Sequence, residues 1–339
     1  MTEFHDDEVS TGRGDEAAVP ARSGCGDHCC RRGSRDGRSD LAALVEAPGF
    51  SGSVLGGHPL TVGAAMPLLD EVVAVTAAGP VILNDIGVHH SPSTLGGLLP
   101  AGQEKVGLRL HPDLIGAAVA CDPAGGTPPS LRLFDDADAA VHTSYLTHTS
   151  DRLAFEALGM LGAAPDGASG PDFPPFRPAS EVQPPEDQID LFDTVLDDGG
   201  LSRVSSLFAG RCADATEVPA PALPEVLEKA AQRALPLSLC ATGSGCQQLH
   251  TGRIDAAREN CGNLLVVSGR ARMMVTLPLL GACWITWTQG IWGPTGAVEL
   301  YDRHGYCCAV LTQTGPVSAA DHAQWDALLH EVAGWHQAA

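Results

Sequence analysis

Three thiols and an imidazole lie close together near the start of the sequence. The segment CGDHCC contains Cys25, His28, Cys29 and Cys30 within six residues. Thiolate sulfur and imidazole nitrogen are the side-chain ligands that soft transition metals prefer. Structural zinc modules use two separated ligand pairs, so this single cluster does not indicate a zinc-stabilised domain. A labile metal-binding or redox role is one interpretation, and an incidental tail sequence is the other.

Histidines at matching places in the two halves of the chain are a second group of candidate ligands. His89 and His90 follow Gly87 in the first half, and His250 occupies the equivalent stretch of the second half. A neutral imidazole is a common ligand of transition metals, but a histidine in a sheet is more often a core or surface side chain. Both interpretations stay open for these three residues.

Common catalytic signatures are absent from the sequence. It lacks GxGxxG after a predicted strand, the GxxxxGK[ST] phosphate loop, the HExxH zinc motif and a GxSxG nucleophile turn. The charge excludes two further classes. The 20 Lys and Arg against 41 Asp and Glu give a formal net charge of −21, which repels nucleic acid and anionic membrane surfaces.

The sequence also predicts a cytoplasmic protein without membrane insertion. Its first residues, MTEFHDDEVSTGRGDE, carry acids where an export signal carries basic and apolar residues. The longest uncharged run, from Met273 to Val298, contains proline, glycine and threonine, and its first part alternates like a strand. This pattern favours a buried sheet segment over a membrane helix.

Composition divides the 339 residues into five parts. Residues 1–38 are rich in Gly, Ser, Asp and Arg and predict a disordered tail. Residues 162–188 are dense in proline and glycine and predict a linker. We therefore expect a first repeat over 39–161, a helical connector over 189–234 and a second repeat over 235–339.

The two expected repeats share four sequence blocks in the same order. Pro112 and Pro278 are 166 residues apart, and the Leu-Phe-Asp ending at Asp135 and the Leu-Tyr-Asp ending at Asp302 are 167 apart. Similar spacing over all four blocks indicates a duplicated unit. The four pairs of blocks are GPVILNDIG and GCQQLHTG; GLRLHPDLIGAAVAC and MMVTLPLLGACWITW; SLRLFDDADAAVHTSYL and AVELYDRHGYCCAVL; and SDRLAFEALGML and SAADHAQWDALLHEV.

Each repeat predicts antiparallel hairpins followed by a helix. Apolar and polar residues alternate on either side of Asp-Asp-Ala-Asp in the first repeat and Asp-Arg-His-Gly in the second. Ser150 and Ser318 are expected to cap the closing helices, the second with Asp321. Between the repeats, DQIDLFDTVL and LPEVLEKAAQRAL predict helices. The predicted fold class is α+β, a tandem duplication of a unit with large antiparallel sheets and flanking helices.

This four-block pattern resembles the haemin-degrading factor family of the HemS/HmuS/ChuX type, over roughly residues 60–335. The closest passages are SLRLFDDADAAVHTSYLTHTSDRLAFEAL, GSGCQQLHTG and AVELYDRHGYCCAVL. The resemblance implies large antiparallel sheets with haem held between the halves, as ligand or substrate. It also implies a role in haem and iron utilisation, with a haem importer and an electron donor as partners.

The resemblance further implies that Arg109, in VGLRLHPDL, contacts haem. The family's axial histidine lies on the connector helix, yet this chain has no histidine between His148 and His250, and the matching position falls at or near Asp190. His89, His90 and His250 are then candidate replacement ligands for the iron, and the CGDHCC segment could capture haem through its soft ligands.

Three functions remain open after the sequence analysis. In the first, the protein is an enzyme that degrades haem with an external reductant. In the second, it carries or buffers haem or another tetrapyrrole without turnover. In the third, the duplicated scaffold has lost haem binding. Whether the protein is an enzyme is therefore undecided at this stage.

Overall fold

The computed structural model describes residues 38–56, 58–99, 105–123, 126–160, 185–212 and 214–337. The CGDHCC cluster and nearly all of the expected tail lie outside the described residues, as does the linker before residue 185. Within the described ranges, no helix is long and apolar enough to cross a membrane.

Period-two alternation produces the strands of the first half. In β2, for example, Val72 and Ala74 are fully buried, whereas their neighbours in the strand are partly exposed. In chain order the first half forms α1 (Asp40–Val45), β1 (Gly52–Val54), α2 (Pro59–Ala65), the 3-10 turn η1 (Met66–Leu69), β2 (Glu71–Ala78), β3 (Val81–His89), β4 (Lys105–Leu110), β5 (Ile115–Cys121), β6 (Ser130–Asp135), β7 (Ala140–Leu146) and α3 (Arg152–Met160).

The second half adds α4 and the strand pair β11 and β12 to a similar series of elements. In chain order it forms α4 (Gln188–Asp198), α5 (Leu201–Phe208), β8 (Ala215–Glu217), η2 (Ala220–Ala222), α6 (Leu223–Gln232), β9 (Pro236–Gly243), β10 (Cys246–Arg253), β11 (Ala256–Asn260), β12 (Asn263–Ser268), β13 (Ala271–Thr276), η3 (Leu277–Leu279), β14 (Leu280–Gly290), β15 (Gly293–Asp302), β16 (Cys307–Thr312) and α7 (Ala319–Gln337).

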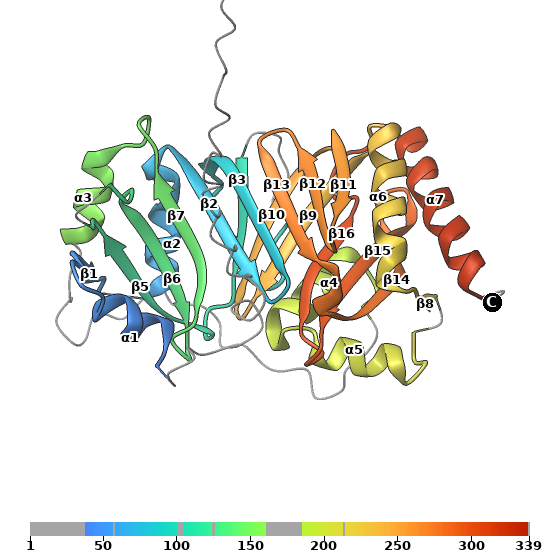
Figure 1. Ribbon diagram of the computed structural model, residues 1–339, viewed down its shortest axis with the longest axis horizontal. Helices are drawn as coiled ribbons and strands as arrows, with labels where there is room; N and C mark the ends of the chain where they lie inside the picture. The colour runs from blue at the N-terminus through green and yellow to red at the C-terminus, as the bar shows by residue number, and fades with distance from the viewer. Residues whose placement is uncertain are drawn as a thin grey trace, which may run out of the picture.

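The strands form two large sheets that lie side by side, one for each half of the chain (Figure 1). The first follows the order β1-β5-β6-β7-β2-β3 and continues from β3 through β13 and β12 to β11. The second follows the order β4-β10-β9-β16-β15-β14-β8. Nearly all neighbours are antiparallel, and a short parallel pairing of β3 with β4 joins the two sheets. The predicted α+β class with large antiparallel sheets is confirmed.

Each half contributes to the sheet of the other half: one strand, β4, comes from the first half, and three strands, β11 to β13, come from the second. Strand β4 from the first half pairs with β10 of the second, with Arg109 opposite Gln247. Strand β13 from the second half pairs with β3 of the first, with Met273 opposite Leu83. Because β4 and β13 occupy equivalent places in their own halves, the exchange is reciprocal. It makes the junction between the halves a continuous hydrogen-bonded structure.

Helices cover both faces of each sheet. In the second half, α6 and α7 pack on one face around the fully buried Trp325, and α4 and α5 pack on the other around Phe192. In the first half, α2 and α3 cover one face and α1 the other. The order α1-β1-α2 before the first hairpin therefore corresponds to α5-β8-α6 before the second. The exact domain boundaries expected from composition stay a prediction.

The predicted hairpins and the four predicted helices are found in the structure. Both connector segments are helices, α4 and α6, and Ser318 caps α7 by accepting a hydrogen bond from the Asp321 amide at 3.0 Å. The expected cap of α3 is wrong by one residue. Asp151 accepts from the Ala154 amide at 2.9 Å, whereas the Ser150 hydroxyl donates to the Glu71 carbonyl at 2.5 Å. The Asp151 carboxylate therefore caps the helix, and the Ser150 hydroxyl instead connects the preceding loop to β2.

A buried ion pair attaches α5 to the second sheet. Arg203 on α5 donates from two nitrogens to Glu299 on β15, at 3.2 and 2.8 Å, and both side chains are almost fully buried. Thr286 and Tyr301 also donate to this carboxylate, each at 2.5 Å. Burial alone would lower the pKa of Arg203, but the charge and hydrogen bonds of Glu299 hold that pKa above its ordinary value.

We predict that Glu299→Ala lowers the free energy of unfolding by on the order of 3–5 kcal/mol, because it leaves the Arg203 charge buried without a partner. The measurement is urea unfolding followed by circular dichroism. In the double variant Glu299→Leu, Arg203→Met both charges are absent, so the loss should be smaller than that of Glu299→Ala. Equal losses in the two variants would contradict this interpretation.

Candidate functional site

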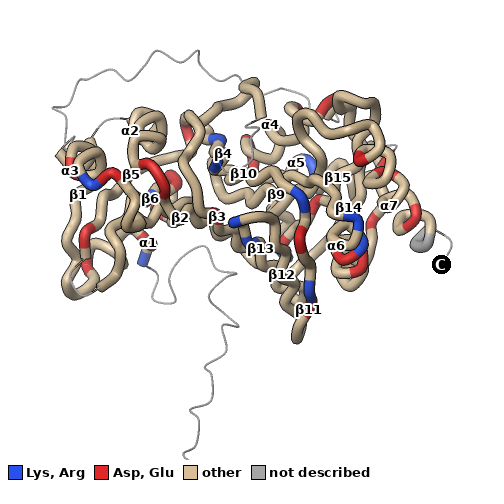
Figure 2. The backbone as a smooth tube through the Cα atoms, turned by 90° about the horizontal axis from the view of Figure 1, so that it is seen from above, with Lys and Arg blue, Asp and Glu red and all other residues tan. Residues whose placement is uncertain are grey.

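Alternation along β4 places a basic side chain at the junction of the two halves. Leu108 and Leu110 point into the apolar core of the first half, whereas Arg109 between them points to the opposite face, beneath α4. Arg109 is fully buried. In Figure 2, basic residues of β4 lie near the middle of the molecule, close to α4.

The Arg109 guanidinium is held by one carboxylate and several neutral groups. It forms an ion pair with Asp193 on α4, and its Nη1 donates to the Gln247 Oε1 atom at 3.1 Å. Its Nη2 also lies 3.4 and 3.5 Å from the carbonyl oxygens of Thr94 and Gly97. The Nε atom has no hydrogen-bond partner within the described part of the chain. Asp193 therefore supplies the negative charge that this buried cation requires.

His111 makes a similar contact with an acid of α4, one helical turn beyond the contact of Arg109 with Asp193. The His111 Nε2 atom lies 3.3 Å from the Asp197 carboxylate. The His111 Nδ1 atom accepts a hydrogen bond from the Asp113 amide at 3.1 Å, so a neutral His111 carries its proton on Nε2, facing Asp197. Burial raises the pKa of Asp197, and the nearby His111 opposes this shift only in part.

The ends and the acidic face of α4 fit its position against Arg109 and His111. Asp187 caps its first turn by accepting from the Asp190 amide at 2.9 Å. Gly199 and Gly200 end the helix, both with positive φ, and a Cβ atom on Gly200 would lie 2.7 Å from the Cβ of Cys307. The acids Asp193 and Asp197 are four residues apart and so share a face of the helix. We refer to Arg109, His111, Asp193 and Asp197 as the α4 clasp.

The apolar side of α4 covers the sheet beside the clasp. Four of its side chains are fully buried, and Phe192 is the largest of them; the set is Leu191, Phe192, Val195 and Leu196. They pack on residues of β9, β10, β15 and β16, among them Leu249 and Val310. Asp190, where the sequence comparison places the family's axial histidine, is exposed on the outer side of the helix. The sheet beside the clasp therefore presents a charged and an apolar surface, and α4 packs on both.

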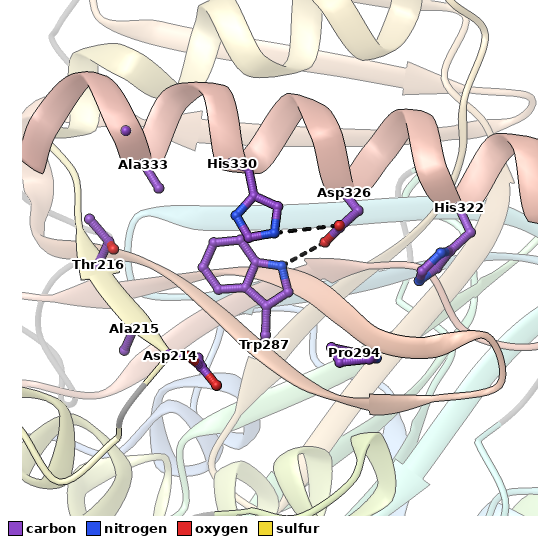
Figure 3. Close-up of a pocket in the computed structure, with 10 residues that line it drawn as sticks. Asp214, Ala215, Thr216, Trp287, Pro294, His322, Asp326, His330 and Ala333 are labelled. Atoms are coloured by element: carbon purple, nitrogen blue, oxygen red, sulfur yellow. Dashed lines mark hydrogen bonds and ion pairs between the residues drawn. The ribbon is translucent and has the colours of Figure 1, made fainter.

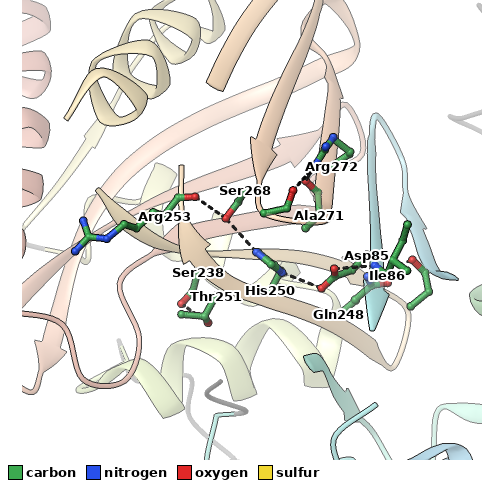
Figure 4. Close-up of polar contacts among 12 residues, drawn as sticks. Asp85, Ile86, Ser238, Gln248, His250, Thr251, Arg253, Ser268, Ala271 and Arg272 are labelled. Carbon is green, nitrogen blue, oxygen red and sulfur yellow. Dashed lines mark hydrogen bonds and ion pairs between the residues drawn. The ribbon is translucent and has the colours of Figure 1, made fainter. Parts of the chain in front are cut away.

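The structure places His250 in a separate polar group, shown in Figure 4. Its Nδ1 lies 2.8 Å from the Asp85 carboxylate and its Nε2 lies 3.0 Å from the Ser268 hydroxyl. The Asp85 carboxylate accepts from Nδ1, so the Nε2 atom of a neutral His250 is an acceptor. The Ser268 hydroxyl lies within hydrogen-bond distance of both this Nε2 atom and the Arg253 carbonyl, which is 2.9 Å away. This buried group connects β10 and β12 with β3 of the first half.

His89 belongs to a third buried group, and neither His89 nor His250 lies at the α4 clasp. The Ser144 hydroxyl lies 2.8 Å from Nε2 of His89 and 3.2 Å from Nε2 of His142, whose Nδ1 lies 2.9 Å from the Thr76 hydroxyl. Burial lowers the pKa of His89 to about 4, although Asp85 opposes the shift. Burial, together with the charge of His89, also lowers the pKa of His142 well below 6.5. His90 is partly exposed.

The sequence analysis found Arg109 but missed three residues of the clasp. Two spacings in the sequence could have indicated that these residues act in pairs. Arg109 and His111 are two residues apart, which puts both on one side of an extended strand, and Asp193 and Asp197 are four apart, which puts both on one side of a helix. Nothing in the sequence alone could pair the strand with the helix, because the pairing depends on the exchange of β4 into the second sheet.

Comparison with known proteins finds a matching domain model and solved structures with this fold. Residues 200–332 match the model of the haemin-degrading HemS.ChuX domain. No curated protein sequence matches the chain. The crystal structure of holo-PhuS, a heme-binding protein from Pseudomonas aeruginosa, has a TM-score of 0.67 at 18% identity, covering 86% of this chain and 88% of that chain. ChuS, an E. coli heme oxygenase, has a TM-score of 0.67 at 18% identity, covering 86% and 90%. At this identity the two structures establish the fold.

We predict that lowering the pH reduces the free energy of unfolding because the imidazoles of His89 and His142 are buried. Between pH 7.5 and 5.0 the unfolded chain takes up protons near the ordinary pKa of 6.5, whereas His89 and His142 stay neutral in the folded state. The free energy of unfolding should therefore fall by about 2 kcal/mol for each imidazole at pH 5.

Urea unfolding at the two pH values measures this loss. The variant His142→Gln should lose less stability between them than the wild type, because one of the two titrating groups is absent. The carboxylates contribute equally to both proteins and cancel in the comparison. An identical pH dependence in wild type and variant would rule out this source.

Proposed function

From the premise that residues 200–332 match the HemS/ChuX domain and that 86% of the chain has the fold of PhuS and ChuS, we propose that this protein binds haem between its halves. The observation that carries the proposal is the fully buried Arg109 beneath α4. Its only charged partner among the described residues is Asp193, a side chain on a helix that lies on the sheet surface.

The basic residues of the clasp suit the carboxylates of haem. Arginine binds a propionate through paired charge-assisted hydrogen bonds, and the Arg109 Nε atom has no hydrogen-bond partner among the described residues. The proton on His111 Nε2 faces Asp197 and could equally face a second carboxylate. Each propionate would thus take the place of an aspartate. The macrocycle would take the place of Phe192 and Val195 on the apolar face.

Haem and α4 therefore compete for one surface in this proposal. The four buried side chains of α4 fill the space beside Arg109, so haem can enter only if the helix moves away. A ligand that shifts such an equilibrium must bind the open state better than the closed one. In the open state the propionates would take the places of the Asp193 and Asp197 carboxylates, and the ring would replace the apolar contacts of α4. These contacts would give haem its higher affinity for the open state.

The iron side of a haem site does not fit the clasp. The His111 Nδ1 atom is used by the Asp113 amide, and its Nε2 carries the proton, so neither nitrogen offers a lone pair. The replacement ligands expected from the sequence, His89, His90 and His250, stay predictions, and two of them are hydrogen-bonded elsewhere. Held mainly by its propionates, haem would be carried or buffered. We therefore favour a haem carrier over a haem-degrading enzyme.

An importer, an electron donor and a cytoplasmic location also stay predictions. The first two come from the resemblance, and the third comes from the acidic start of the sequence. Loss of the Soret band on adding a reductant in air, with release of chelatable iron, would support the enzyme instead of the carrier.

We predict a saturable Soret shift at one equivalent when hemin is titrated into the full chain. Arg109→Ala should weaken binding tenfold or more, because hydrogen bonds to charged groups contribute about 1.5–3 kcal/mol. Asp193→Asn should strengthen binding, because the competing charge is gone. Lys105→Ala, which removes an exposed cation from the same strand, is the matched control and should bind as the wild type does.

Two outcomes of this titration would contradict the proposal. Absence of a saturable shift would show that the chain does not bind hemin. Weaker binding by Asp193→Asn would show that Asp193 assists the ligand instead of competing with it.

Iron-free protoporphyrin IX tests which part of haem the protein recognises. If the propionates dominate, the porphyrin should bind within about tenfold of hemin, measured by quenching of tryptophan fluorescence. Replacement of His89, His90 or His250 by Ala should then change the affinity for hemin little. Much weaker binding of the porphyrin than of hemin, together with loss of hemin binding in one of these variants, would instead identify an iron ligand.

A further inference from the structure

A cavity of about 570 Å³ opens at the far end of the second half, between α7 and the strands β8, β14 and β15. Its size is typical of pockets that bind small molecules. Figure 3 shows Trp287 rising from β14 toward α7, with Asp326 and His330 facing it from the helix. The wall opposite α7 includes Asp214 and Thr216.

The polar groups of this cavity are fixed by contacts with one another. The Trp287 Nε1 atom donates to the Asp326 Oδ1 atom at 2.7 Å, and His330 Nε2 lies 3.4 Å from the other carboxylate oxygen. The His330 ring stacks on the indole with centroids 4.5 Å apart and an angle of 14°. His322, one turn before Asp326, lies 3.2 Å from the Thr295 hydroxyl. The cavity thus has an aromatic wall with an oriented carboxylate at its edge.

The charge of the cavity is negative. Asp214 and Asp326 both line it, and none of the described residues that line it is a lysine or arginine. Asp326 accepts from the neutral indole N–H, which orients the carboxylate without cancelling its charge. The net charge of −21 adds a long-range attraction for cations. An aromatic wall with two acids is the combination that recognises ammonium and guanidinium groups.

We propose that this cavity binds a small organic cation, an amine or guanidinium attached to a planar or apolar body. The cationic group pairs with Asp326, Asp214 adds a second negative charge to the cavity, and the body lies against the Trp287 and His330 rings. A metal ion is a poorer occupant, since no three His, Cys, Asp or Glu side chains of the described residues are placed to ligate one.

This cavity is separate from the α4 clasp. Residues of β14 alternate between the faces of the sheet. Trp284 and Thr286 face α5, where they contact Phe208 and Glu299, whereas Trp287 faces α7. The sheet therefore stands between the two sites, and the proposal does not depend on haem binding.

Benzylamine is the probe that we would use, with benzyl alcohol and benzoate as the neutral and anionic counterparts of similar size. Titrations of the full chain are followed by the indole N–H signals in two-dimensional NMR, in which Trp287→Phe identifies the Trp287 signal. We expect a saturable shift of that signal with benzylamine, at least tenfold weaker binding of benzyl alcohol, and none of benzoate. Added salt should weaken the binding of benzylamine.

Asp326→Asn is the decisive variant, because an amide oxygen can still accept from the indole while the charge is lost. Benzylamine should bind to it at least tenfold more weakly, and Asp214→Asn should show a smaller loss in the same direction. Asp190→Asn, which neutralises an exposed acid on α4, should bind as the wild type does. Unchanged thermal unfolding shows that each variant is folded. Equal binding of benzylamine and benzyl alcohol, no shift with benzylamine, or wild-type binding by both cavity variants would overturn the proposal.

Discussion

The burial of the Arg109 cation at the junction of the two halves is the constraint on which the position of α4 depends. Arg109 lies on a strand that leaves the first half and hydrogen-bonds to β10 of the second, so its guanidinium is buried at the junction. A buried cation requires a charged partner, and α4 provides one. The position of α4, and with it the cover over the apolar face of the second sheet, follows from this requirement. A ligand with carboxylates can satisfy the same cation, which connects the fold to its proposed use.

The protein has two sheets, and the second sheet carries both proposed sites. One of its faces lies beneath α4 and α5, with the clasp at one end and the Arg203–Glu299 ion pair beneath α5. The other face lies beneath α6 and α7 and ends at the acidic cavity. The clasp presents cations and the cavity presents anions. The two sites therefore select ligands of opposite charge from opposite sides of one sheet.

Much of the fold could be predicted from the sequence, and less of the site. The hairpins and the closing helices follow from alternation, turn residues and helical spacing, which are local signals. The Ser318 cap was predicted correctly, whereas the cap of α3 was wrong because Ser150 bonds to Glu71, a residue far away in the sequence. The clasp was missed for the same reason. Arg109 on β4 and Asp193 on α4 are 84 residues apart in the sequence, and the exchange of β4 into the second sheet brings them together.

Hydrogen exchange in α4 tests most directly whether haem and this helix compete for Arg109. The amides of residues 188–198 should be protected in the protein alone, because α4 lies clasped to the sheet. With hemin saturating, we predict that these amides exchange at least tenfold faster, while those of α5, anchored by Arg203 and Glu299, stay unchanged. Saturable hemin binding with unchanged protection of α4 would contradict the account, since haem would then occupy another part of the molecule.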